Sequence, residues 1–199
     1  MISALGRWQA AQPGVLTLAI DGPGGSGKST LAAAVARATG AALVHTDDFF
    51  LRPAASAAAP ALAQYYDWRR LRAEALEPLT AGGDATFGRF DWEGDTGPGG
   101  TGRGGTERGG VVTVRRSALI VLEGVYSAGP ELSDLVDRSV LVDTPEPERL
   151  RRLRARVAPE EWDGDWLLAE QAYFGAIRPP TSFDLIVSGT GVDPPASGR

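Results

Sequence analysis

The stretch Gly22-Pro23-Gly24-Gly25-Ser26-Gly27-Lys28-Ser29 decides the fold, because it satisfies the pattern G-x-x-x-x-G-K-[ST] in full. It follows the apolar run 15–20, which predicts a buried strand, and precedes the Ala-rich run 28–39, which predicts a helix ending at Gly40. The glycines let the backbone wrap so that several N–H groups point inward at phosphate oxygens, and the helix aims its positive dipole end at the same place. This strand, turn and helix predict a nucleotide site.

The side chains of the loop are expected to complete that site. Lys28 supplies a mobile cation for the β- and γ-phosphates, and the Ser29 hydroxyl can complete a Mg²⁺ shell. The residues expected to bind the nucleotide are Gly22, Gly24, Gly25, Ser26, Gly27, Lys28, Ser29 and Thr30. Loops of this kind occur in kinases, GTPase switches, motor ATPases and passive nucleotide-binding proteins, so other residues must decide between these classes.

The rest of the chain alternates between strand and helix patterns. Further strands are predicted at residues 41–45, 111–114, 118–122, 139–142 and 183–187, and helices at residues 68–79, 145–157 and 165–177. The alternation predicts an α/β fold with a mainly parallel five-stranded sheet and helices on both faces. We expect one domain over residues 1–199, with a connector at 53–63, a flexible Gly-rich insertion at 94–110 and a short lid at about 154–165.

Composition excludes several kinds of partner. The net charge of −5 argues against a general nucleic-acid binder, which needs a broad basic surface. The chain has no cysteine, so neither disulfides nor thiolate metal sites can form. Its apolar runs are far shorter than the roughly 20 residues that span a bilayer, and residues 1–12 lack the pattern of a signal peptide. We therefore expect a cytoplasmic protein without nucleic-acid or membrane partners.

Two acidic residues, Asp47 and Asp48, follow the strand predicted at 41–45. Ligands of doubly wound sheets bind at the carboxyl ends of the strands. A carboxylate at this position can accept the proton of an acceptor hydroxyl that attacks the γ-phosphorus, or hold magnesium through water. The alternative is that the pair simply caps the next helix.

Residues 22–30 and the segment Thr46-Asp47-Asp48-Phe49-Phe50 together resemble the uridine kinase and nicotinamide riboside kinase group of P-loop kinases. The resemblance spans residues 15–189. It implies a P-loop NTPase fold and an enzyme that uses ATP and Mg²⁺ to phosphorylate a hydroxyl of a nucleoside-like small molecule. It also implies that Asp47 is the catalytic base and that Asp48 supports substrate binding.

Two further segments are candidates for binding the acceptor. Asp67, after Tyr65-Tyr66, is either a helix cap or the residue that receives the ribose hydroxyls in similar enzymes. The segment Phe90-Asp91-Trp92 resembles the family's aromatic-Asp-aromatic stretch beside the nucleobase, although it also fits an aromatic pair packed under a loop. Phe90 replaces the family's Tyr, and the family's following His is absent, which argues against uridine as the acceptor.

Glu123, at the end of the strand 118–122, matches a family Glu-Gly and is expected to orient Mg²⁺ or its waters, with a capping role as the alternative. In the helix 145–157, Arg149, Arg152 and Arg156 share one stripe. The resemblance gives these arginines substrate and lid contacts. The alternative is a solvated face paired with acidic residues, for example Glu148 with Arg152.

The predicted catalytic set is Lys28, Asp47, Arg152 and Arg156, with Ser29 and Glu123 at the metal. Glu170 lies at the flank of the core-facing side of the helix 165–177, and its pattern does not assign it a role. Three other functions stay open: a nucleoside monophosphate kinase, a GTPase-type switch and a non-catalytic nucleotide-binding module. The guanine-reading pattern Asn-Lys-x-Asp is absent, which argues against the switch.

Overall fold

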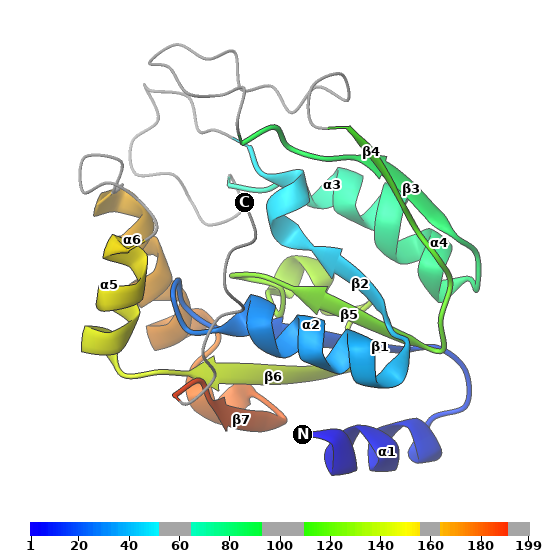
Figure 1. Ribbon diagram of the computed structural model, residues 1–199, viewed down its shortest axis with the longest axis horizontal. Coiled ribbons are helices and arrows are strands. Elements are labelled where there is room, and N and C mark those ends of the chain that lie inside the picture. Colours follow the sequence, from blue (N-terminus) through cyan, green and yellow to red (C-terminus); the bar gives the residue numbers. More distant parts are fainter. Residues whose placement is uncertain (52–64, 93–109, 156–163, 191–199) are drawn as a thin grey trace.

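The computed structural model describes residues 1–51, 65–92, 110–155 and 164–190. These residues contain a five-stranded parallel sheet with the strand order β2-β5-β1-β6-β7 (Figure 1). The strands are β1 Leu16–Asp21, β2 Ala42–His45, β5 Leu119–Glu123, β6 Arg138–Asp143 and β7 Leu185–Ser188. The predicted fold class is thereby confirmed, and the central strand β1 leads directly into the loop of residues 22–29, called the phosphate loop below.

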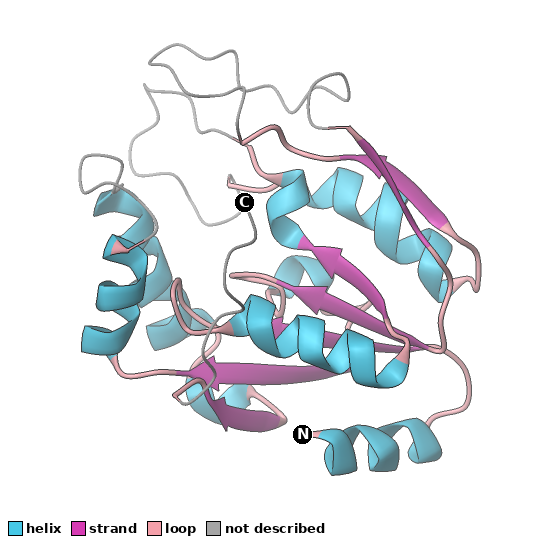
Figure 2. Ribbon diagram, viewed as in Figure 1, coloured by secondary structure: helices cyan, strands magenta, loops and turns pink. Residues whose placement is uncertain are grey.

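Helices lie on both sides of this sheet (Figure 2). The α-helices are α1 Ile2–Ala11, α2 Lys28–Thr39, α3 Trp68–Leu71, α4 Glu77–Thr80, α5 Glu146–Arg154 and α6 Gly164–Ala172. Two π-helical segments continue helices, η3 Arg72–Leu76 between α3 and α4 and η6 Tyr173–Ile177 after α6. Short 3₁₀ turns form η1 Thr46–Phe49, η4 Pro130–Leu132 and η7 Pro180–Ser182.

One face of the sheet is covered by α1 and α2. Leu18 and Ile20 of β1 pack there with Ala32 and Val35 of α2 and with Leu5 of α1. All five side chains are almost completely buried. Fully burying a leucine or isoleucine side chain contributes roughly 1.5–3 kcal/mol, so this contact fixes the start of α2 against the sheet.

The other face is covered by the continuous helix of α3, η3 and α4. Its core residues are those predicted to share one side, Leu71, Ala75, Leu76 and Leu79, and each is fully buried. They pack in the same cluster as Val44, Ile120 and Leu122 of the sheet. The two helical layers leave the carboxyl ends of the strands open for a ligand site, as in other doubly wound sheets.

The sequence patterns missed one strand and one α-helix. The strand expected at 111–114 is β4 Val111–Val114, which pairs antiparallel with β3 Ala85–Gly88 in a separate hairpin. Neither β3 nor α1 was predicted. The connector 53–63 and all but Gly110 of the insertion 94–110 lie outside the described residues, as do Arg156 and residues 156–163 of the expected lid.

Candidate active site

The phosphate loop joins β1 to α2 and leaves the first turn of α2 open. Gly27 precedes the helix with φ of 101°, in the left-handed region, and no side chain caps the helix start. The first N–H groups of a helix have no intrahelical partner, so an uncapped start provides donors for an anion. Lys28 is 7 % exposed, and its Nζ donates to the carbonyl oxygen of Pro23 at 3.1 Å. The start of α2 and the Lys28 ammonium therefore provide donors of the kind that the predicted phosphate site needs.

Helix α5 packs directly onto this loop. Gly25 has φ of +75°, and a Cβ there would lie 2.7 Å from the carbonyl oxygen of Arg149. The Arg149 Nη1 donates to the carbonyl oxygen of Gly24 at 2.9 Å. The Arg152 Nη1 lies 3.3 Å from the carbonyl oxygen of Gly25, and its Nη2 lies 3.1 Å from that of Gly189. Two of the three predicted arginines thus reach the loop, while Arg156 lies outside the described residues.

Arg152 also pairs with Glu148, the contact that we expected if the arginines formed a solvated face of the helix. Its Nε donates to Glu148 Oε1 at 2.8 Å, four residues earlier in α5. The same carboxylate pairs with Arg151 at 2.7 Å. The guanidinium of Arg152 therefore connects an acidic residue on the helix surface with the backbone of the phosphate loop.

The end of β5 lies beside the start of α2. The Ser29 hydroxyl donates to Glu123 Oε1 at 3.0 Å, and His45 Nδ1 lies 2.7 Å from Glu123 Oε2. His45 is the register partner of Glu123 across β2 and β5, which explains why the two meet. Burial opposes ionisation of Glu123, but the hydrogen bond from His45, the charge of Lys28 and the Ser29 hydroxyl together lower its pKa. The hydrogen bond to Glu123 raises the pKa of His45.

Ser29 and Glu123 together fit a magnesium ion. Mg²⁺ in nucleotide sites takes one or two protein oxygens and completes its shell with waters and phosphate oxygens. A hydroxyl and an ionised carboxylate 3.0 Å apart at the phosphate loop supply such a pair. Among the described residues, no group of three or more acidic, His or Cys side chains forms a dedicated metal cage. The donor set therefore suits a metal that arrives with a nucleotide.

Asp47 lies in the turn η1, directly after β2. Its Oδ1 accepts a hydrogen bond of 3.1 Å from the hydroxyl of Tyr66, and the residue stays accessible to solvent. Desolvation by the surrounding protein raises the pKa of Asp47, and repulsion from Glu123 adds to this, while Lys28 and Tyr66 oppose it. Lys28 and Glu123 thus act electrostatically on Asp47, as expected of groups that share one site.

A glycine allows β5 and η1 to come this close. Gly124 follows Glu123 with φ of +149°, and a Cβ there would lie 1.7 Å from the Thr46 hydroxyl oxygen. No side chain fits that space without moving Thr46, the residue before Asp47. The Glu-Gly pair therefore sets the approach of the two acidic groups.

Asp48, the next residue of the turn, contacts the segment that contains the predicted aromatic residues. Asp48 pairs with Arg89 at 3.4 Å, and its carbonyl oxygen accepts the Phe90 amide at 2.9 Å. Desolvation by burial raises the pKa of Asp48, against the charge of Arg89. Phe90 is buried against Phe50, with ring centroids 5.2 Å apart, whereas Trp92 is 55 % exposed and also contacts Phe50.

Asp67 is the N-cap of α3, with its Oδ1 accepting the Arg70 amide at 2.9 Å. The capping role predicted for Asp67 is confirmed, and its binding of an acceptor stays a prediction. Asp91 follows Phe90 in the same described segment, and its predicted role is likewise untested.

Sequence patterns did not identify Asp21, a fully buried residue at the end of β1. Its carboxylate accepts the amides of Gly22 at 2.7 Å, Tyr126 at 3.0 Å and Ala128 at 3.0 Å, and the Tyr173 hydroxyl at 2.7 Å. Tyr126 has φ of 69°, an unfavourable region for a residue with a Cβ. Asp21 therefore holds the first residue of the phosphate loop to the segment after β5 and to η6.

The structure also shows the contacts of Glu170, a residue to which the sequence pattern assigned no role. Glu170 is 3 % exposed, and its Oε1 accepts the amide of Gly24 at 2.8 Å and the indole Nε1 of Trp166 at 2.8 Å. Arg149 Nη1 lies 3.7 Å from its Oε2. Figure 1 shows α5 and α6 side by side at the end of the sheet where β6 ends. Both helices thus contribute charged side chains to the phosphate loop.

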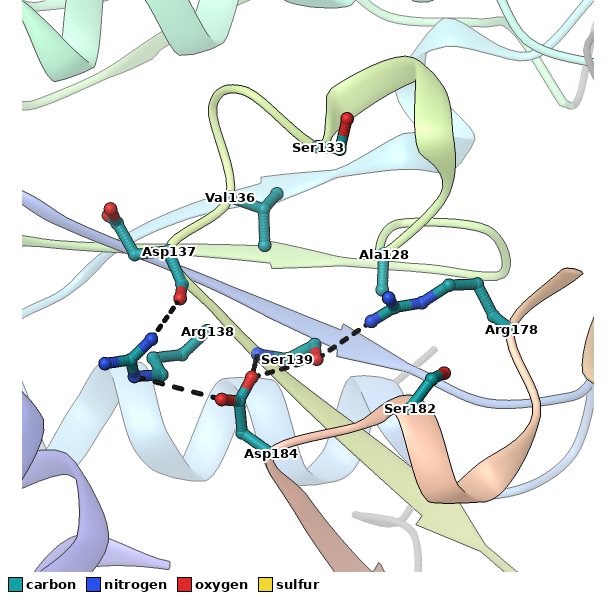
Figure 3. Close-up of a pocket in the computed structure, with 9 residues that line it drawn as sticks. All are labelled: Ala128, Ser133, Val136, Asp137, Arg138, Ser139, Arg178, Ser182 and Asp184. Carbon is teal, nitrogen blue, oxygen red and sulfur yellow. Dashed lines mark hydrogen bonds and ion pairs between the residues drawn. The ribbon is translucent and has the colours of Figure 1, made fainter.

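A separate polar pocket lies at the opposite ends of the strands, where β6 and β7 begin (Figure 3). Arg138 Nε lies 3.9 Å from Asp184 Oδ1, and Arg178 Nη2 donates to the Ser139 hydroxyl at 3.0 Å. Positive and negative groups are balanced among its lining residues, so no charged ligand is favoured. We assign this pocket no function.

No protein family model matches the chain, and no curated protein sequence matches it. Solved structures do. A possible uridine kinase from Bacillus stearothermophilus is 24 % identical with a TM-score of 0.66, covering 93 % of this chain and 96 % of that one. A proposed fructose transport system kinase from Silicibacter sp. TM1040 is 20 % identical with a TM-score of 0.58, covering 92 % and 95 %. These likenesses show that the chain shares the fold of the two structures.

Within the described residues, no helix is long and apolar enough to cross a membrane.

Proposed function

We propose that the protein is a kinase that transfers the γ-phosphoryl group of ATP to a hydroxyl of a nucleoside-like small molecule. One observation carries the proposal. Asp47, whose pKa is raised, lies in a turn beside the Ser29–Glu123 pair, and the lysine of the phosphate loop acts on both carboxylates. Asp47 follows β2, which only β5 separates from the strand that leads into the phosphate loop. A phosphate loop with a solvent-accessible carboxylate nearby is the arrangement that phosphoryl transfer to a hydroxyl requires.

In this proposal each residue has a distinct role. The amides of residues 24–29 and the Lys28 ammonium bind the phosphates and stabilise the charge that develops during transfer. Ser29 and Glu123 hold the magnesium, which neutralises phosphate oxygens when it is bound. Asp47 accepts the proton of the acceptor hydroxyl as the hydroxyl oxygen forms a bond to the γ-phosphorus. The bond between that phosphorus and the β–γ bridging oxygen breaks, and ADP leaves. Tyr66 orients that carboxylate through its hydrogen bond of 3.1 Å.

The acceptor side supports an uncharged alcohol with a flat ring. Phe50, Phe90 and Trp92 form an aromatic surface beside Asp48, and the exposed indole of Trp92 can stack on a ring. An acceptor phosphate would have to compete with carboxylates for the arginines near this surface. Arg89 is paired with Asp48, and Arg70 with Glu74 at 2.9 Å. These pairings favour a nucleoside-like acceptor over a nucleoside monophosphate.

An acceptor screen with Mg²⁺ and ATP tests the proposal by measuring release of ADP. The panel contains pyrimidine nucleosides, nicotinamide riboside, pantothenate, sugars, UMP and CMP. We expect at least one unphosphorylated alcohol to raise ADP release well above the rate without acceptor. Faster turnover with UMP or CMP than with every nucleoside would instead identify a monophosphate kinase. Background release across the panel would leave only a nucleotide-binding module.

A further inference from the structure

The contact between Glu170 and Gly24 brings a negative charge to a loop that the proposed function uses for binding a highly anionic triphosphate. The carboxylate lies 2.8 Å from the Gly24 amide and is almost completely shielded from solvent. Two like charges a few ångströms apart repel strongly where water is excluded. A bound triphosphate and the Glu170 carboxylate in its present position therefore oppose each other.

Three donors converge on the Glu170 carboxylate, and each is of a kind that binds phosphate. They are the Gly24 amide, the Trp166 indole N–H and, at 3.7 Å, the Arg149 guanidinium. Arg149 also holds the carbonyl oxygen of Gly24 at 2.9 Å, so the guanidinium stays at the loop independently of Glu170. An oxygen of a phosphate group can satisfy the same donors, because backbone amides and guanidinium groups are standard phosphate ligands.

We propose that the Glu170 carboxylate occupies a phosphate position at the Gly24 amide when nucleotide is absent, and that a bound nucleotide displaces it. The inference rests on the nucleotide site of the proposed function and adds a residue that sets its affinity. Glu170 then competes with the nucleotide phosphates for the Gly24 amide. It keeps this amide hydrogen-bonded in the empty loop and lowers the affinity for nucleotides.

Displacement of Glu170 also frees the indole of Trp166, which lies one helical turn earlier in α6. The ring of Trp166 packs against Tyr65, with centroids 4.8 Å apart, and against Phe50 at 6.4 Å. Phe50 belongs to the aromatic surface assigned to the acceptor. The C-terminal continuation of α6 stays fixed, because Tyr173 is hydrogen-bonded to Asp21 at 2.7 Å. Nucleotide binding is therefore expected to change the environment of Trp166 without detaching the helix.

The variant Glu170→Gln separates charge from shape, since its amide oxygen can still accept from Gly24 and Trp166. We expect calorimetric titration with ATP to show at least about tenfold tighter binding to this variant than to the wild type, because the repulsion is removed. The control is Glu77→Gln, which makes the same change in net charge at an exposed position of α4 and is expected to bind ATP as the wild type does. Equal or weaker binding by Glu170→Gln would overturn the inference and leave Glu170 as a structural clamp.

A second measurement does not depend on folding of the Glu170 variant. The chain has five tryptophans, so the contribution of Trp166 is the difference between the wild type and Trp166→Phe. We expect ATP to change the fluorescence of the wild type more than that of Trp166→Phe. Identical changes in the two proteins would contradict displacement. Absence of ATP binding by the wild type itself would instead refute the proposed nucleotide site, so the two failures are distinguishable.

Discussion

The hydroxyl of Ser29 lies 3.0 Å from Oε1 of Glu123, a residue 94 positions later in the chain. The first belongs to the phosphate loop and the second to the end of a neighbouring parallel strand. Their contact connects the phosphate loop to the acidic residues of the candidate site.

We predict that Glu123→Gln weakens the use of magnesium by 10- to 100-fold, the range typical when a metal site loses a tuned oxygen ligand or its partner. Glutamine keeps the size of the side chain but removes the charge that His45, Lys28 and Ser29 stabilise. The measurement is the Mg²⁺ concentration for half-maximal ADP release at saturating ATP, with Glu77→Gln as control. An unchanged Mg²⁺ requirement would remove Glu123 from the metal site.

The pH dependence of turnover tests the environment of Asp47. Desolvation and Glu123 raise its pKa, and a base must be ionised to accept a proton, so turnover is lost as the pH falls through this raised pKa. The hydrogen bond from Tyr66 lowers the same pKa. We therefore predict that Tyr66→Phe moves the acid limb of the kcat profile to higher pH. An acid limb that stays in place or moves to lower pH would show that another group controls it.

The stability of the loop is predicted to depend on Asp21. Asp21→Asn replaces a carboxylate that accepts four hydrogen bonds with an amide that has only one oxygen, which leaves buried donors without partners. We expect the free energy of unfolding in urea to fall by about 2–4 kcal/mol. The control is Asp134→Asn, which loses only the exposed pair with Arg72 and should leave the free energy of unfolding nearly unchanged. A loss as small as that of the control would contradict the role of Asp21.

Local patterns predicted much of the fold. The helix expected at residues 28–39 matches α2 at both ends, because glycines in left-handed conformations precede and follow an Ala-rich run. The ends of the strand predicted at 118–122 each lie within one residue of the ends of β5. A fully buried strand is a continuous apolar run, so its ends are easy to recognise in the sequence. Strand β3 was missed because Ala85–Gly88 is four residues long and ends in glycine, which is a weak strand signal.

The candidate site was predictable where a short local pattern marked it. The motif at residues 22–29 identified Lys28 and Ser29, and the ends of two predicted strands identified Asp47 and Glu123. The electrostatic effects of Lys28 and Glu123 on Asp47 and the contact of Ser29 with Glu123 relate these residues to one another in the structure. The pairing of His45 with Glu123 depends on the register of β2 against β5, which the sequence of neither strand specifies. The contact of Glu170 with Gly24 joins residues 146 positions apart and depends on how α6 packs beside α5.

In the proposed reaction, Asp47 acts as the base toward an acceptor held beside ATP. The most direct test is Asp47→Asn, assayed for ADP release with the best acceptor of the screen and for ATP binding by calorimetry, with Asp134→Asn as control. We predict that kcat falls at least about 10²-fold, as for loss of a general base, while the Kd for ATP changes only a few-fold. Near-normal turnover by Asp47→Asn would contradict the account.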